Sequence, residues 1–451
     1  MRYIAHTQED IREMLIRIGV ADVDALFEQI PDNSRLSRPL CLPAALSEPE
    51  LLSHMADLAQ RNQPHSRPLS FLGAGIYRHY SPAVIDQLLL RGEFLTAYTP
   101  YQPELSQGTL QAIFEFQTMI AELLGTDVAN ASLYDGSTAT AEAVLMARRI
   151  TRRSRCLVSS GVHPEYQQVA AAYNEGNHGQ LEVISLDGNG TTDINNVQKQ
   201  LDKDVACVVL AQPNFLGVLE DVAVWHQLAQ SHGAMLVVVV TEPSAFAVFE
   251  APGQCGADIV AGEGQALGLA PNLGGPHCGI FGTRSAHVRQ MPGRLCGRTV
   301  DKDGRPGFVL TLSTREQHIR REKATSNICT NQGLMALAVG MYLTWVGPTG
   351  LERVARINLA RTESLKQKVV EIPGFSLKYP NATTYNEFVL KTPMNADSLA
   401  GRLHDVGIAP GLPLGRFFPE LADCLLVNVT EVHSESDLDR LCNALAMVVP
   451  T

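Results

Sequence analysis

Short apolar runs alternate with amphipathic stretches through the middle of the chain. The apolar runs lie at 129–133, 156–159, 181–186, 205–211, 234–240, 258–261 and 279–282. Stretches with helical periodicity lie between the first five of these runs, at 139–150, 163–174, 193–201 and 220–232. The run at 236–240 is apolar on both faces, which is typical of a strand covered on both sides. The pattern predicts a large α/β domain with a seven-stranded, mostly parallel sheet.

Helical patterns precede this domain. Thr7 has the position of a helix N-cap, and Ser47 with Glu50 has capping-box spacing. Prolines interrupt residues 1–70, so we expect a helical N-terminal arm that packs over another surface and has no core of its own. Further helices are predicted at 82–91 and 108–124, and a glycine ends the second.

The last part of the chain predicts a small α+β domain. Long helices are expected first, at 331–345 and 348–370. The elements that follow have a βαβ-like order, with strands at 375–379, 384–390 and 425–429 and helices at 396–406 and 435–448. We therefore expect three parts: the arm at 1–70, the large domain at 71–330, and connecting helices with a small domain at 331–451.

Charge and composition exclude several classes of protein. The chain has 47 acidic and 36 basic residues, and its largest basic cluster is a group of arginines between Arg148 and Arg155, so no nucleic-acid partner is expected. No apolar run approaches the roughly 18 residues of a membrane span. Nine scattered cysteines without Cys-x-x-Cys spacing argue against a disulfide framework or a metal site. The N-terminus has no secretory pattern, so a cytoplasmic location is expected.

One glycine-containing turn could bind phosphate. Gly136, Ser137 and Thr138 follow Asp135 between the first strand and the next helix. Free backbone N–H groups and the positive end of the helix dipole are what a phosphate site needs at such a position. Asp135 and Ser137 are equally ordinary N-cap residues, so a simple helix cap is the alternative.

Other polar residues follow the strands. Ligands bind beyond the carboxyl ends of strands in open parallel sheets. Here the second strand leads to His163, the fifth to Glu242 and the sixth to Gln265. This spacing resembles fold-type I pyridoxal-phosphate enzymes, in which, as the resemblance implies, a histidine or aromatic ring stacks on the cofactor, an aspartate meets its pyridine nitrogen, and a lysine forms the Schiff base. Alternatively, His163 and Glu242 are polar loop ends that contact solvent or backbone.

The lysine that this chemistry needs is missing. The chain has eight lysines, and none lies between 203 and 302, the stretch that holds the fifth to seventh strands. A Schiff base cannot form without an amine. If the chain has this fold, covalent cofactor chemistry belongs to another chain.

Four longer runs carry a specific resemblance. They are LTAYTPYQPELSQG at 95–108, NASLYDGST at 130–138, GGPH at 274–277 and TREQHIRREKATSNI at 314–328. In this order they resemble the α subunits (subunit 1) of glycine dehydrogenase (decarboxylating), the P-proteins of the glycine cleavage system. The likeness covers nearly the whole chain.

The resemblance implies a two-chain enzyme. The partner β subunit would carry a His-Lys pair and hold pyridoxal phosphate covalently, whereas the same position here falls on Gln265 and Ala266. An α₂β₂ assembly would decarboxylate glycine and pass its aminomethyl group to the lipoyl arm of the H-protein. No catalytic residue and no covalent cofactor are then expected on this chain, and Gly136, Ser137, Thr138, His163 and Glu242 would be a vestigial cup. Glu242 departs from the aspartate expected in some relatives.

A proline-stiffened loop is the first candidate to line the partner's active site. Its candidate residues carry phenols, hydroxyls and amides that can form hydrogen bonds; they are Tyr98, Thr99, Tyr101, Gln102 and Gln107. Alternatively, the tyrosines only pack between helices.

A second candidate is Thr325, Ser326 and Asn327, just before the helix predicted from 331. In fold-type I dimers, as the resemblance implies, this segment approaches the neighbour's phosphate, and hydroxyls and amides at a helix start suit that anion. Alternatively, Thr330 or Asn331 merely caps its own helix.

Two other functions compete with this interpretation. The first is an autonomous pyridoxal-phosphate enzyme that uses Lys302 or Lys323. The second is a non-catalytic scaffold or regulatory paralogue that binds no β subunit. Absorbance near 400 nm, recorded for the chain alone and with a β subunit, would separate all three.

Overall fold

A computed structural model describes residues 5–36, 38–61, 69–272 and 274–448. The chain divides into two compact units, Met1–His65 and Ser66–Thr451. The three-part division expected at residues 70 and 330 stays a prediction.

The first unit is built from two capped helices, α1 (Gln8–Ile18) and α2 (Glu48–Gln60). As predicted, Thr7 caps α1 and Ser47 forms a capping box with Glu50. None of the described residues of this unit is buried, and most of its apolar side chains are exposed. The unit therefore has no core of its own within the described residues.

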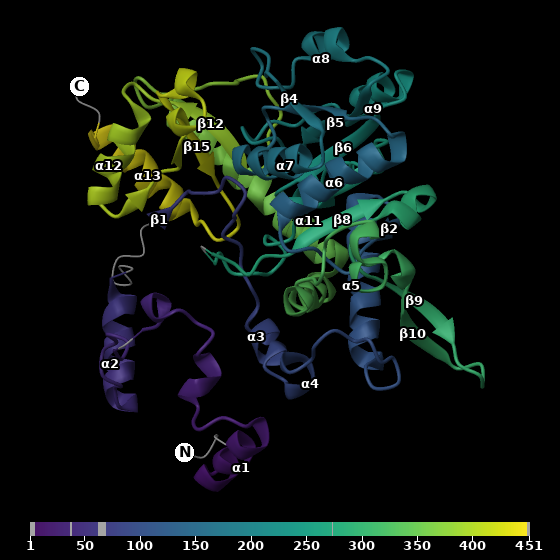
Figure 1. Ribbon diagram of the computed structural model, residues 1–451. Coiled ribbons are helices and arrows are strands. Elements are labelled where there is room, and N and C mark those ends of the chain that lie inside the picture. The colour runs from purple at the N-terminus through teal and green to yellow at the C-terminus, as the bar shows by residue number, and fades with distance from the viewer. Residues whose placement is uncertain (1–4, 37, 62–68, 273, 449–451) are drawn as a thin grey trace. The chain divides into compact units, whose positions relative to one another are not determined.

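A seven-stranded sheet organises the second unit (Figure 1). Its order is β2-β8-β7-β6-β5-β3-β4. All neighbouring strands are parallel except β8, which runs antiparallel to β7 and β2, so the prediction of a mostly parallel sheet is confirmed. The strands are β2 (Val128–Ala129), β3 (Arg155–Ser159), β4 (Gln180–Ile184), β5 (Val205–Ala211), β6 (Met235–Val240), β7 (Ile259–Glu263) and β8 (Gly279–Thr283).

Helices cover both faces of this sheet. On β6, Val237 and Val239 join one core cluster, whereas Leu236 and Val238 join another. The first cluster contains residues of α6 (Gly136–Thr151) and α7 (Pro164–Gly176). The second contains residues of α5 (Gln107–Leu124), α8 (Ile194–Gln200), α9 (Val222–Ser231) and α11 (Gly333–Val370). A period of two therefore sends alternate side chains into two cores.

The helix α11 joins the two predicted helices at 331–345 and 348–370. It is broken at Gly347, whose φ of 59° lies in the left-handed region, immediately before Pro348. By length and composition α11 could cross a membrane, but core helices of soluble proteins pass the same test. Its first half packs in the core through Ala338, Val339 and Tyr342.

The sequence did not predict an antiparallel hairpin of β9 (Leu295–Val300) and β10 (Pro306–Thr311). The hairpin projects from the body of the domain beside α5 (Figure 1). Its polar tip at 298–305 interrupts the apolar pattern, so no strand signal stands out. The short helices α3 (Ala83–Leu89) and α4 (Gly92–Leu95) precede α5.

The C-terminal domain has an antiparallel sheet in the order β11-β12-β15-β14. The expected βαβ-like order is therefore wrong, because after α12 (Ala396–Asp405) the chain forms β14 before it enters β15 in the opposite direction to β12. The strands are β11 (Ser376–Leu377), β12 (Glu387–Lys391), β14 (Leu412–Pro413) and β15 (Cys424–Asn428). With α13 (Glu435–Val448), the sheet makes an α+β part of the second unit, which we call the C-terminal domain; its boundary as a separate domain stays a prediction.

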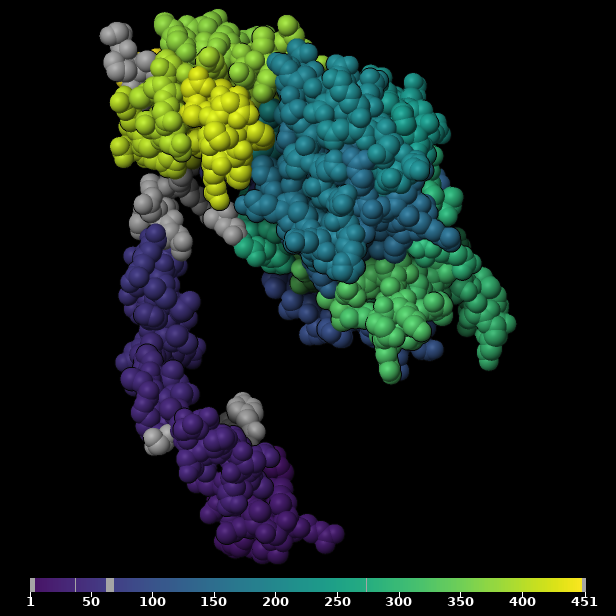
Figure 2. Space-filling model, turned by 45° about the horizontal axis from the view of Figure 1, so that its top comes forward, coloured from purple at the N-terminus to yellow at the C-terminus, as the bar shows by residue number. Residues whose placement is uncertain are grey.

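This domain packs directly on the large sheet domain (Figure 2). A shared apolar cluster includes Phe215 and Leu216 from the large domain and Val389 and Leu426 from the small one. A short parallel pair, β1 (Leu69–Ser70) with β13 (Ile408–Ala409), ties the start of the unit to the C-terminal domain.

Candidate functional site

The carboxyl ends of β3, β6 and β7 lead to His163, Glu242 and Gln265, the edge where ligands bind in such sheets. Residues 73–81, which we call the crossing segment, contact all three. The crossing segment forms no helix or strand. The structure therefore brings the expected ring-facing residues together, with the chain's own backbone against them.

His163 lies at the start of α7, half-buried against the crossing segment. Its Nδ1 accepts a hydrogen bond from the Glu165 N–H (3.2 Å), so Nε2 carries the proton and donates to the Ala74 carbonyl (3.0 Å). The ring stacks on Tyr166 at 4.8 Å. Burial lowers the pKa of His163. A Cβ on Gly75 would lie 2.9 Å from this imidazole, so the backbone already contacts it.

Glu242 is buried, and each of its oxygens is used. Oε1 accepts from the Ser244 hydroxyl (2.6 Å), and Oε2 binds His79 Nε2 (2.8 Å) and the Asn386 amide (3.0 Å). The other His79 nitrogen binds Glu431 (2.8 Å). Burial opposes the charged imidazole, but these two carboxylates outweigh it and raise the pKa of His79 to about 10. Glu242 therefore pairs with an imidazolium of its own chain.

The Schiff-base position holds no amine. The Gln265 side chain bonds to both backbone groups of Tyr77, accepting from its N–H (2.8 Å) and donating to its carbonyl (2.9 Å). Ala266 is buried. Of the alternative lysines, Lys302 lies in the exposed turn of the β9–β10 hairpin and Lys323 in an exposed 3-10 turn, so neither is on these strand ends.

The turn at 136–138, considered above as a phosphate site, contacts two carboxylates. The Asp135 carboxylate accepts from the Thr138 N–H (2.7 Å) and the Ser137 hydroxyl (2.9 Å). The Gly136 N–H donates to Glu263 (3.0 Å), a buried residue. These contacts are the ones expected if the turn only caps its own helix. A dianionic phosphate would face two carboxylates here, so this turn does not fit the cofactor phosphate.

The two segments expected to serve the partner lie next to each other. Arg294, which is buried, donates to the Tyr101 hydroxyl (3.2 Å), to the Cys329 carbonyl (2.8 Å) and to Asn331 (3.0 Å). Tyr98 and Thr99 line a cleft of about 170 Å³ together with Asn331. One arginine therefore joins the loop at 98–102 to the segment before α11.

Side chains of the first segment differ in exposure. Tyr98 is 86% exposed, whereas Tyr101 is 50% exposed and its ring contacts His318 and Arg294. Gln102 is exposed and Thr99 is half-buried. Gln107 has a structural contact, because its amide donates to the Phe308 carbonyl (2.9 Å) and accepts from the Phe308 N–H (2.9 Å).

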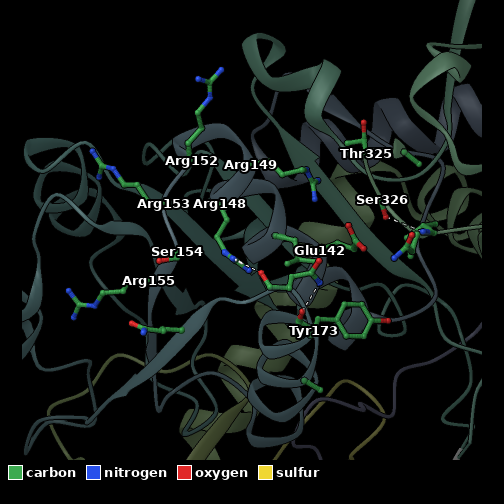
Figure 3. A pocket seen from close by; sticks show the side chains of 18 of the residues that line it. Glu142, Arg148, Arg149, Arg152, Arg153, Ser154, Arg155, Tyr173, Thr325 and Ser326 are labelled. Carbon is green, nitrogen blue, oxygen red and sulfur yellow. Dashed lines mark hydrogen bonds between the residues drawn. The ribbon is translucent and has the colours of Figure 1, made fainter. Parts of the chain in front are cut away.

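Thr325, Ser326 and Asn327 line a cavity of about 1130 Å³ over α6, with Glu142 and Arg149 (Figure 3). The Ser326 hydroxyl accepts from the N–H two residues later (3.1 Å). The capping alternative is wrong, because the N-cap of α11 is Gln332 and the Asn331 amide donates to Ala131 and Ser132.

The arginine cluster in this cavity is not one anion site. Figure 3 shows its guanidinium groups pointing in different directions. Arg148 binds Asn174 (2.7 Å), Arg153 binds backbone carbonyls, and Arg155 pairs with Glu182 (2.8 Å). The cluster holds neighbouring elements together. In the described chain no group of three or more His, Cys, Asp or Glu could hold a metal ion.

The comparisons with known proteins agree on one family. A model of the glycine cleavage system P-protein family matches residues 1–445. Probable glycine dehydrogenase (decarboxylating) subunit 1 of Sorangium cellulosum is 49% identical over 456 residues, covering 100% of both chains. The same-named protein of Rhizorhabdus wittichii is 49% identical over 452 residues, 99% of each chain.

Solved structures agree as well. The crystal structure of an inhibitor-bound glycine decarboxylase (P-protein) of the glycine cleavage system superimposes with a TM-score of 0.89 and 46% identity over 100% of both chains. Lactobacillus brevis glutamate decarboxylase shares the fold alone, with a TM-score of 0.67 at 14% identity over 94% of this chain and 97% of that one.

Proposed function

The chain belongs to the glycine cleavage system P-protein family, and on that premise we propose that it is the lysine-free α subunit of a glycine dehydrogenase (decarboxylating). Together with a β subunit it decarboxylates glycine and passes the aminomethyl group to the lipoyl arm of the H-protein. The observation that carries the assignment to an α subunit is Gln265-Ala266 after β7, where the Schiff-base amine would be needed.

Pyridoxal phosphate would then be held by the β subunit, where its pyridinium would stabilise the carbanion left after decarboxylation. This chain contributes by closing the partner's cavity and excluding water. We assign that task to the loop at 98–102 and to Thr325, Ser326 and Asn327. Arg294 links Tyr101 to Cys329, two residues after Asn327, which supports a shared surface.

An α₂β₂ assembly would cover apolar side chains that this chain leaves exposed. Leu95 is 50% exposed, Leu105 81% and Trp345 63%, and the arm adds further ones. Obligate interfaces bury more than about 2,000 Å² in total and are rich in such residues. None of the nine cysteines forms a disulfide, which suits the cytoplasm, where we place the enzyme.

The test is a comparison of the chain alone, the β subunit alone and their mixture. After addition of pyridoxal phosphate and borohydride, mass spectrometry of the mixture should show a pyridoxyl adduct on β and none at stoichiometric level on this chain. Glycine decarboxylation should require both chains. A near one-to-one adduct on any lysine here contradicts the proposal, and a lack of any complex with β favours a scaffold.

A further inference from the structure

The crossing segment is held by both domains of the second unit. From the large domain it contacts the strand ends described above, and from the C-terminal domain it contacts Glu387, Thr430 and Glu431. In two-domain enzymes of this kind, a ligand cleft between domains opens and closes around substrate. Here the chain itself lies across that position.

Tyr77 makes the first bridge. It is only 2% exposed, and its hydroxyl lies 3.2 Å from Thr241 Oγ1 on the large domain and 2.8 Å from Glu387 Oε2 on the C-terminal domain. The other oxygen of Glu387 accepts from the Ala74 N–H (2.7 Å). One buried side chain therefore joins β6 to β12.

His79 makes the second bridge. It joins Glu242 after β6 to Glu431 after β15, with 2.8 Å contacts on both sides and only 2% of the imidazole exposed. The Tyr80 N–H also donates to Glu431 (2.7 Å). A buried imidazolium between two carboxylates is costly to separate, because each group would be left charged without a partner.

We propose that the crossing segment is an internal substitute for the cofactor: it fills the ligand position of this subunit and locks the C-terminal domain onto the sheet. The subunit then keeps one closed arrangement and has no place for pyridoxal phosphate, even without a covalent bond. The turn at 136 already faces Asp135 and Glu263, which are the wrong charge for a phosphate, and Glu242, the acid expected to meet the pyridine nitrogen, is bound to His79 of the segment. The proposal does not depend on which reaction the assembled enzyme catalyses.

Hydrogen exchange of the full chain tests the lock directly. The amides of Ala74, Tyr77 and Tyr80 all donate to side chains of the two domains. These three amides should exchange slowly although they belong to no helix or strand. Exchange as fast as in the exposed turn at 301–304 would overturn the proposal.

A double variant, Tyr77→Phe with His79→Gln, tests the bridges. Loss of these contacts should make amides of 384–391 and 425–431 exchange at least about tenfold faster, the effect of losing even one hydrogen bond of about 1.4 kcal/mol, while β5 is unchanged. Tyr80→Phe is the matched control, since that side chain is exposed. Equal acceleration everywhere would show general destabilisation and refute a lock.

Cofactor binding gives an independent readout. Titration of the full chain with pyridoxal phosphate should show no saturable absorbance change at one equivalent. Saturable one-to-one binding would contradict the proposal that the crossing segment fills the cofactor position. The proposed function is tested separately: it would fail only if the mixture with β did not decarboxylate glycine.

Discussion

Buried ionisable residues at the strand ends are organised around the crossing segment. Glu387 is fully enclosed, and burial raises its pKa from 4.5 to about 7, although hydrogen bonds from the Ala74 N–H and the Tyr77 hydroxyl oppose this. His79 remains charged because two carboxylates flank it. Such shifts often mark catalytic groups. Here they belong to contacts within one chain, so they bear on stability.

The raised pKa of Glu387 predicts a specific dependence of stability on pH. Between about pH 4.5 and 7 the folded chain holds a proton there that the unfolded chain has lost. Stability from this group is therefore fully present below about pH 4.5 and is lost as pH rises towards 7, by at most about 1.4 kcal/mol per pH unit.

Glu387→Gln should make the free energy of unfolding depend less on pH between about pH 5 and 7. Urea midpoints measured at pH 5, 6, 7 and 8 should fall less steeply between pH 5 and 7 in the variant than in the wild type. Glu420→Gln, which changes an exposed glutamate of the same domain, should leave the slope unaltered. A variant slope equal to that of the wild type would contradict the assignment.

Periodicity predicted most helices and strands of the large sheet domain because buried elements repeat every two or 3.6 residues, but it did not predict the β9–β10 hairpin. It therefore located the strand ends and the helix N-caps at Thr7 and Asp135. It did not predict the crossing segment, because apolar residues in that segment have no regular spacing and the segment is held by side chains distant in sequence, such as Gln265 and Glu387. Residue types alone also could not tell that the glycine turn at 136 faces carboxylates.

The segment before α11 has a testable role of its own. Ser326→Ala with Asn327→Ala should lower the activity of the α–β complex at limiting pyridoxal phosphate, because under the proposed function it removes a hydroxyl and an amide donor to the partner's phosphate. Excess cofactor should partly restore activity.

A measurement of stability distinguishes a role of this segment in cofactor binding from a purely structural role. Asn327 is exposed, and within the described chain Ser326 bonds only to the nearby Ile328 N–H and to Glu142, so the melting temperature of the isolated double variant should fall only slightly. Unchanged cofactor affinity in the assembled double variant would confine the segment to packing.

At the scale of the whole molecule, exposed apolar residues argue for an incomplete surface. The first unit buries none of its described side chains, and the second leaves Leu105 and Trp345 uncovered. A chain with a net charge of −11 stays soluble despite such patches, but the patches still mark contact sites.

Light scattering should show directly whether a β subunit binds to these exposed apolar residues. Equimolar α and β at micromolar concentration should form a species with the mass of an α₂β₂ complex. Leu105→Glu should weaken it more than tenfold, because a charge would be buried in the contact. Val183→Glu, on a strand at the sheet edge and 54% exposed, is the control of matched chemistry. Separate species under these conditions would refute the assembly.

The proposed filling of the ligand position would also keep a catalytic lysine alone from restoring a cofactor site in this chain. Ala266→Lys would return an amine to the Schiff-base position, yet that residue is 1% exposed and its neighbour Gln265 binds Tyr77 on both backbone groups. A restored site would also require withdrawal of the segment and release of Glu242 from His79. No single mutation does all of this, so under the proposed function the chain would still depend on its partner after such a substitution.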